Sequence, residues 1–109
     1  MKSNEIITRI RSLIRRGRYR LSHHAERERD RDRIQMTELE EAPRSGGLEI
    51  IEDYPDDQRG HSHLVLGFSR ENRPIHVVCA IHEGSLIIIT VYRPDPKLWQ
   101  NNRVRKEQE

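Results

Sequence analysis

The segment from Tyr54 to Trp99 constrains the fold more than any other part of the chain. It holds three apolar runs separated by two short polar joints. The runs are His63–Phe68, Ile75–Ile81 and Leu86–Tyr92. Runs of this length, rich in β-branched residues, are typical of strands. Turn residues at Asn72 and at Glu83-Gly84 fit tight reversals between them. The segment therefore predicts a three-stranded antiparallel meander.

The meander strands predict two sheet faces of different character, because side chains alternate across a strand. We assign a wholly apolar set to the face that helices cover, namely Leu64, Leu66, Phe68, Ile75, Val77, Cys79, Ile81, Ile87, Ile89 and Val91. The opposite, mixed set is His63, Val65, Gly67, His76, Val78, Ala80, His82, Leu86, Ile88, Thr90 and Tyr92. We expect this second face to be open, and an exposed face with so much apolar area favours a binding site. Antiparallel sheets also tolerate a half-solvated face.

The segment before the meander predicts three helices and two strands. The helices are expected at Asn4–Arg16, which ends at Gly17, at His23–Arg33, which Ser22 can cap, and from the capping box Thr37-Glu38-Leu39-Glu40 to the region of Pro43–Gly47. The strands are expected at Arg18–Leu21 and Leu48–Tyr54. The fold class is α+β, with the N-terminal helices packed on one face of a small, mainly antiparallel meander. A single domain spans residues 1–99, and residues 100–109 form a polar, frayed tail.

Composition narrows the classes of partner. The chain has 109 residues, which fits one domain, and 17 of its 20 basic residues are arginine. Arginine pairs bidentately with phosphate and carboxylate groups. Because 18 acidic residues nearly balance the basic ones, composition favours nucleic acid only slightly over an acidic protein. The single cysteine, Cys79, excludes a disulfide within the chain, and no signal core or membrane-spanning run is present, so we expect a cytoplasmic protein without a membrane partner.

The first candidate site lies at the end of the last predicted strand. His76 is one strand across from Thr90 and Tyr92, and Arg93 follows directly. Metal-free RNA cleavage needs a base, an acid and a cation near the phosphate. His76, Tyr92 and Arg93 therefore form a candidate catalytic set, with Thr90 contacting the substrate. In the alternative interpretation Tyr92 packs against Pro94 and His76 is structural.

The second candidate site lies on the charged helix. His24, Glu28 and Asp32 follow the i, i+4, i+8 spacing of one helical stripe. His24 is a further catalytic candidate that can orient the sheet site, and Arg20 and Glu28 are substrate contacts. Ion pairing of the stripe with Arg20 or Arg93 fits better than metal binding, and we expect neither metal nor cofactor. The remaining histidines, His23, His61, His63 and His82, are assigned to the surface or to turns, and Tyr19, Tyr54 and Trp99 to packing.

Five sequence stretches together resemble a bacterial family of small toxin-like domains of unknown function. They are HHAERERDRDRI, YPDD, HLVLGF, RPIHVVCA and ITVYRPDPKLW, within Leu21–Trp99. The chain departs from the family at Arg29, where relatives carry a medium-sized apolar residue. The family is distantly similar to toxins of the RelE, BrnT and MqsR type, which implies a RelE-like fold and a zinc-finger antitoxin of the MqsA type as partner. No residue is carried over as catalytic.

The resemblance and the arginine-rich composition favour a toxin of a type II toxin–antitoxin pair that acts on RNA as a metal-independent ribonuclease. The alternative is a non-enzymatic protein-binding module or regulator that uses the open sheet face within a homo- or hetero-oligomer. A nuclease that binds metal through His24, Glu28 and Asp32 is a third candidate.

Overall fold

The computed structural model describes residues 3–42 and 47–107. Its helices are α1 (Ser3–Arg15), α2 (His23–Arg31) and α3 (Met36–Glu41). Its strands are β1 (Tyr19–Leu21), β2 (Glu49–Tyr54), β3 (Ser62–Phe68), β4 (Pro74–His82), β5 (Ser85–Tyr92), β6 (Trp99–Gln100) and β7 (Val104–Arg105). The expected elements up to residue 92 are therefore all present, with ends shifted by a few residues. The expected end of the third helix lies partly outside the described residues.

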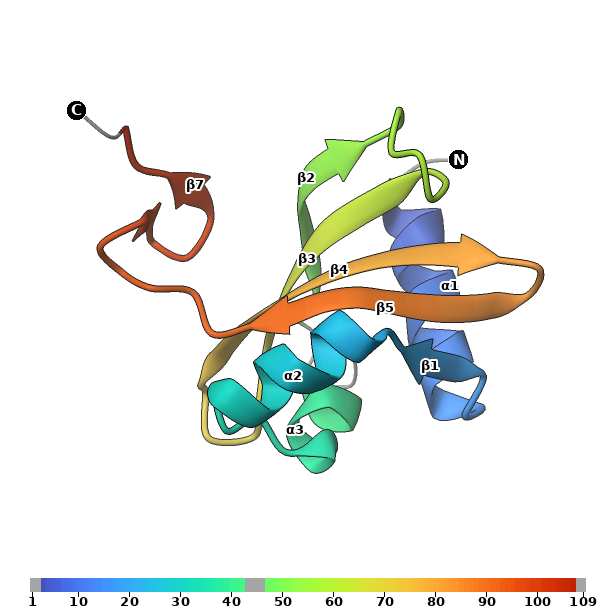
Figure 1. Ribbon diagram of the computed structural model, residues 1–109, viewed down its shortest axis with the longest axis horizontal. Helices are drawn as coiled ribbons and strands as arrows, with labels where there is room; N and C mark the ends of the chain where they lie inside the picture. Colours follow the sequence, from blue (N-terminus) through green and yellow to red (C-terminus); the bar gives the residue numbers. More distant parts are fainter. Residues whose placement is uncertain (1–2, 43–46, 108–109) are drawn as a thin grey trace.

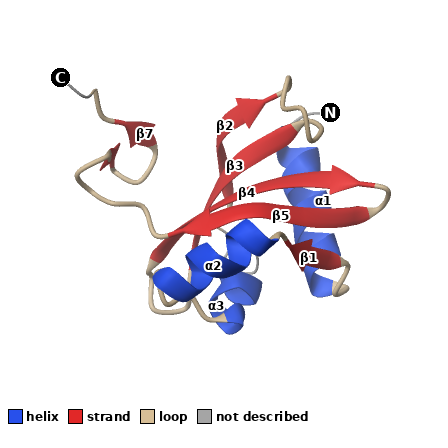
Figure 2. Ribbon diagram, in the orientation of Figure 1, coloured by secondary structure: helices blue, strands red, loops and turns tan. Residues whose placement is uncertain are grey.

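Five strands form one sheet in the order β1-β5-β4-β3-β2 (Figures 1 and 2). β1 runs parallel to β5, and the other neighbours are antiparallel. The reversal between β4 and β5 uses Glu83 and Gly84, both with positive φ, a conformation that suits a two-residue hairpin turn. The α+β class and the central meander are thus confirmed.

The core lies between one face of the sheet and the helices. α1 passes behind the strands in Figure 1 and buries Ile6, Ile10 and Leu13 in the same cluster as the strand residues. α3 contributes Leu39 to this cluster, and Ala42 follows directly. The sheet contributes Val65, Ile75, Cys79, Leu86, Ile88 and Val91. Full burial of a large aliphatic side chain stabilises a fold by about 1.5–3 kcal/mol, so this layer supplies the main favourable free energy of folding.

The predicted face assignment is wrong for β3. In the register of β3 and β4, Leu66 pairs with His76 and Leu64 pairs with Val78, so both leucines lie on the face opposite the helices. Gly67 lies on the helical face instead. A Cβ atom at Gly67 would be 2.8 Å from the Cβ atom of Ala42, so only glycine allows α3 to approach β3 this closely.

The prediction also fails for part of β5, because a bulge shifts its alternation. Thr90 pairs with Val78, but Ile88 pairs with the next residue, Cys79, and Ile89 is the extra residue. A shift of one residue moves every following side chain to the other face. Leu86 and Ile88 therefore join the helical core, whereas Ile87 and Ile89 do not. His76, Thr90 and Tyr92 remain together on the second face, as predicted.

The second face is partly covered by the residues after β5. β6 and β7 pair as a small antiparallel hairpin, which differs from the frayed tail expected after residue 99. Trp99 is buried, and the Arg103 Nε lies 3.0 Å from a carboxylate oxygen of Glu49. The Arg105 Nε lies 2.9 Å from Glu52 in the same strand, β2. One large aromatic ring and two ion pairs therefore attach this segment to the sheet.

Candidate functional site

α2 runs beside β5 beyond the point where β1 stops pairing with it (Figure 1). Two polar side chains of this region bind the backbone of β5 around the bulge. The Ser22 hydroxyl donates to the Ile89 carbonyl at 2.8 Å, and the Val91 amide donates to the Glu28 carboxylate at 3.3 Å. Ser22 also accepts the Ala25 amide at 3.0 Å, which caps the helix as predicted. A helix with almost no apolar side can therefore dock through hydrogen bonds.

Asp32 extends this contact to the end of β5. Its carboxylate accepts the Arg93 amide at 2.9 Å, and its carbonyl accepts the Arg93 Nε at 3.2 Å. Burial disfavours the Asp32 carboxylate, but hydrogen bonds from Arg93 and Arg31 outweigh burial and hold its pKa below the usual value. Arg93 also contacts Glu38 at 2.7 Å. Arg93 is thus joined to the helical stripe by hydrogen bonds that use backbone groups, whereas its ion pair is with Glu38 and not with the stripe as expected. Arg93 joins the end of α2 to α3 instead of the sheet face of His76.

The same stripe holds an imidazole at the surface. The Nε2 of His24 lies 3.1 Å from Oε1 of Glu28. The His24 side chain is 59% exposed, whereas the Glu28 side chain is only 11% exposed. Glu28 is thus fixed by the sheet backbone and in turn orients an accessible imidazole. An accessible imidazole held by a carboxylate is an arrangement found in general acid–base catalysis.

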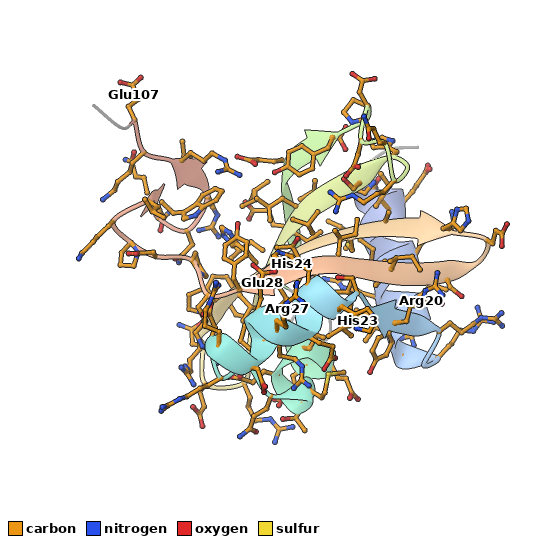
Figure 3. All side chains as sticks on the ribbon, viewed as in Figure 1. Arg20, His23, His24, Arg27, Glu28 and Glu107 are labelled. Atoms are coloured by element: carbon orange, nitrogen blue, oxygen red, sulfur yellow. The ribbon has the colours of Figure 1, made fainter. Side chains whose placement is uncertain are left out.

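Arginine is concentrated in the segment that precedes this pair in the sequence. Residues 9–20 contain six arginines and no acidic residue, so the rest of the chain has 14 basic and 18 acidic residues and is net acidic. Arg9, Arg16 and Arg18 border one surface hollow, and Arg18 and Arg20 border a second. In Figure 3 Arg20 of β1 and His23, His24, Arg27 and Glu28 of α2 lie on the same side of the molecule. Concentrated positive charge of this kind attracts anions such as phosphate groups.

His76 occupies a different environment. It is fully buried, and its Nε2 lies 2.7 Å from the Asn102 carbonyl. A carbonyl can only accept, so Nε2 carries the hydrogen and Nδ1 of the neutral ring accepts the Tyr92 hydroxyl at 3.2 Å. The ring of Trp99 packs edge-on against it with 4.5 Å between ring centroids. Burial lowers the pKa of His76 and raises that of Tyr92 to about 12.

The structure therefore brings together some of the predicted site residues and separates others. His76 and Tyr92 meet, as expected, but the C-terminal hairpin closes over His76. Arg93 binds elsewhere, and Thr90 is a partly exposed neighbour on the same sheet face. His24 and Glu28 form an accessible pair, and Arg20 lies on the adjacent strand. None of these placements tests a catalytic role.

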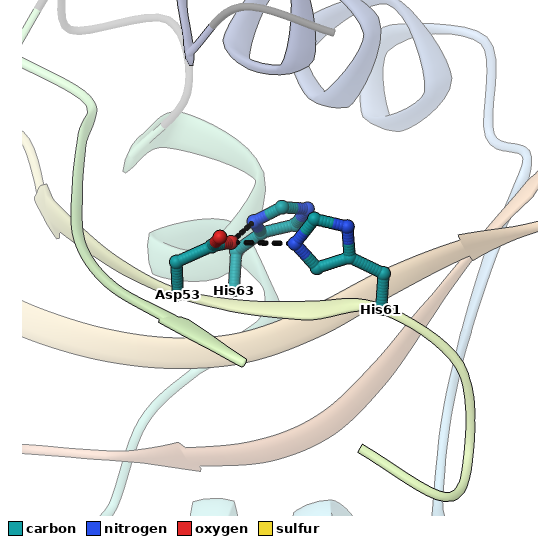
Figure 4. A group of neighbouring side chains, drawn as sticks. All are labelled: Asp53, His61 and His63. Carbon is teal, nitrogen blue, oxygen red and sulfur yellow. Dashed lines mark hydrogen bonds and ion pairs between the residues drawn. The ribbon is translucent and has the colours of Figure 1, made fainter. Parts of the chain in front are cut away.

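A third group was missed by the sequence prediction. Asp53, His61 and His63 come together where β2 ends and β3 begins (Figure 4). The sequence analysis places both histidines at the surface or in turns, yet His63 is buried. The His-x-His spacing places both rings on one side of an extended chain and was the available signal. Within residues 3–42 and 47–107, this is the one group of His, Cys, Asp and Glu side chains with the spacing of a metal site.

Comparison with known proteins places the chain in a family. Residues 21–93, more than half of the chain, match the sequence model of a domain of unknown function (DUF4258), and the chain belongs to this family. The match covers α2, the meander and the strand before it. No curated protein and no solved structure matches the chain. In the part of the chain that the structure describes, no helix is long and apolar enough to cross a membrane.

Proposed function

We propose that the chain binds RNA and cleaves it without a metal ion, as the toxin of a type II toxin–antitoxin pair. One observation carries the proposal. An exposed imidazole, His24, lies 3.1 Å from the largely buried carboxylate of Glu28, on the same side of the molecule as Arg20 and Arg27. General bases of this kind need access to substrate, a fixed orientation and a partner for the charge they acquire. His24 has all three, whereas His76 lacks access.

Arg20 and Arg27 extend from the same side of the molecule as His24 (Figure 3) and are exposed. Guanidinium groups bind phosphate oxygens bidentately and stabilise the charge that develops during phosphoryl transfer. In the proposed reaction, His24 accepts the proton of a ribose 2′-hydroxyl. The 2′-oxygen then bonds to phosphorus, the bond from phosphorus to the 5′-oxygen breaks, and that oxygen takes a proton from water. The imidazolium returns its proton to the resulting hydroxide, which restores neutral His24. Glu28 stabilises the imidazolium.

The experiment measures cleavage of a labelled RNA by the purified chain in the presence of EDTA. We expect His24→Ala to lower the cleavage rate by about 10²–10⁴-fold, the usual contribution of a general base. His61→Ala is the matched control, because the His61 side chain is 49% exposed and also lies beside a carboxylate, that of Asp53, at the other edge of the sheet from α2. Equal rates for both variants, or loss of cleavage on chelation, would contradict the proposal.

The toxin role has a separate test in cells, since the family resemblance is its main support. Expression of the chain in a bacterial host should arrest growth, and His24→Ala should relieve the arrest at the same protein level. Co-expression of the neighbouring gene, which we expect to encode a zinc-finger antitoxin, should restore growth. RNA cleavage in vitro without growth arrest would show that the chain is a ribonuclease but not a toxin.

A protein-binding module is the second candidate function. The exposed large apolar residues of the described chain are Leu98 and Val104, at 48% and 60% exposure, and both lie in the segment that covers the second sheet face. This candidate predicts a stable assembly by light scattering and no RNA cleavage. Leu98→Ser together with Val104→Ser should dissociate that assembly into its subunits.

A further inference from the structure

Asp53, His61 and His63 gather at the edge of the sheet opposite α2. β2 is the last strand on that side, and Asp53 pairs directly with His63 of β3 across the two strands. His61 is two residues before His63, so both rings emerge on the same side of the chain. Figure 4 shows both imidazoles turned toward the carboxylate of Asp53. The sequence brings three side chains that can ligate a metal to one point through strand register.

The contacts within this group are unusual because two imidazoles approach one carboxylate oxygen. Nε2 of His61 and Nδ1 of His63 each lie 2.7 Å from Oδ1 of Asp53. The two rings are tilted by 40° with their centroids 4.5 Å apart. Two ring nitrogens therefore converge on one carboxylate oxygen.

His63 supplies an independent observation. It is 6% exposed, and its Nδ1 atom is buried without a hydrogen-bond partner among the described residues, because the short approach to Asp53 is poorly aligned. Buried polar atoms are nearly always satisfied, so an unsatisfied nitrogen close to a carboxylate needs an explanation. A cation between the nitrogen and the carboxylate would satisfy both.

We propose that Asp53, His61 and His63 bind one divalent transition-metal ion of the Zn²⁺ class. The site offers two imidazoles and one carboxylate, a donor set that suits Zn²⁺, Co²⁺ or Ni²⁺ better than Mg²⁺ or Ca²⁺. The three ligand atoms already lie within 4.8 Å of one another. Ligand atoms of a tetrahedral zinc site lie about 3.3 Å apart, so small side-chain rotations complete it.

The exposure of the ligands indicates what the ion would do. The side chains of Asp53 and His61 are about half exposed, so a fourth coordination position faces solvent. The ion would join the end of β2 to the start of β3 and close the loop of residues 55–60 between them. It would act at the edge of the sheet far from His24, so this inference does not depend on the proposed ribonuclease activity.

The test is calorimetric titration of the metal-free full chain with Zn²⁺ alone. We expect one ion per chain. Loss of a group that merely orients a ligand weakens metal affinity by about 10–100-fold, so loss of a ligand in His61→Gln or Asp53→Asn should weaken it by at least about 100-fold. His82→Gln is the matched control, because it removes an exposed imidazole that also lies near a carboxylate, that of Glu83, outside this group. This control should bind Zn²⁺ like the parent chain.

Co²⁺ substitution gives a second readout through the visible absorption of the ion. A tetrahedral site with nitrogen and oxygen ligands should give intense visible bands, without the charge-transfer band of a thiolate from Cys79. His61→Gln keeps the test decisive even where His63→Gln fails to fold, because His61 is an exposed loop residue. Absence of Zn²⁺ binding by the parent chain, or equal affinity in His61→Gln and His82→Gln, would overturn the proposal. Either outcome leaves RNA cleavage, which is measured in EDTA, unaffected.

Discussion

His24 and His76 are both held by polar partners, yet they have opposite surroundings. His24 is 59% exposed and its partner is a carboxylate, whereas His76 is fully buried between a carbonyl and a phenol. An anionic partner stabilises the protonated ring, and a buried neutral site opposes it. Solvent exposure and the charge of the partner therefore distinguish a histidine suited to proton transfer from a histidine suited to packing.

Removal of the side chain that covers His76 should have the largest effect on stability and on the accessibility of this histidine. Trp99→Ala should lower the free energy of unfolding by about 3 kcal/mol, since loss of a buried large aromatic ring typically costs 3–5 kcal/mol and the C-terminal hairpin can move to reduce the cavity. Chemical denaturation measures the change. In the same variant, a reagent that modifies imidazole should reach His76. Continued protection of His76 would show that the hairpin does not control its access.

The two histidines themselves should differ in their effect on stability. His76→Ala should destabilise the fold by about 2 kcal/mol, because it leaves the Asn102 carbonyl and the Tyr92 hydroxyl without a partner. His24→Ala replaces a surface side chain and should change stability by no more than about 0.5 kcal/mol. Urea unfolding of both variants gives the values. Similar losses for the two would remove the distinction between them.

Low pH should lower the contribution of His76 to the free energy of unfolding. Burial lowers the pKa of folded His76 from the usual 6.5, so below pH 6.5 the unfolded chain binds a proton that the folded chain does not. The contribution of His76 to stability is therefore present above pH 6.5 and is lost as the pH falls through the folded pKa. Denaturation curves between pH 7 and 5 should show this loss in the parent chain and less of it in His76→Gln. An identical slope in both would contradict the assignment.

Local features of the chain predict most of the fold. The three apolar runs, the turns at Asn72 and Glu83-Gly84, and the cap at Ser22 depend on neighbouring residues, and the structure contains each of them. The predicted assignment of β3 and β5 side chains to the two sheet faces was wrong. The bulge at Ile89 and the register of β3 against β4 are set by pairing between distant segments. Alternation alone does not reveal them.

The candidate sites divide in the same way. His24 and Glu28 could be paired from sequence, because i, i+4 spacing places them together on any helix. Asp53 meets His61 and His63 only through the register of β2 and β3, which no local pattern encodes. The C-terminal hairpin was missed for a related reason. It is attached by Trp99 and by ion pairs to residues more than fifty positions earlier in the chain, and its own sequence is polar.

The contact between α2 and β5 has a consequence for association of the chain with itself. A strand that ends a sheet presents free amides and carbonyls on which another molecule can add a strand. From Ile89 to Arg93, the acceptors and donors of Ser22, Glu28 and Asp32 occupy those groups. We therefore expect Glu28 of α2 and Asp32 at its end to limit pairing of this edge with a second molecule. Glu28→Gln together with Asp32→Asn would remove negative charge from this edge, and loss of solubility at high protein concentration should be the first observable effect.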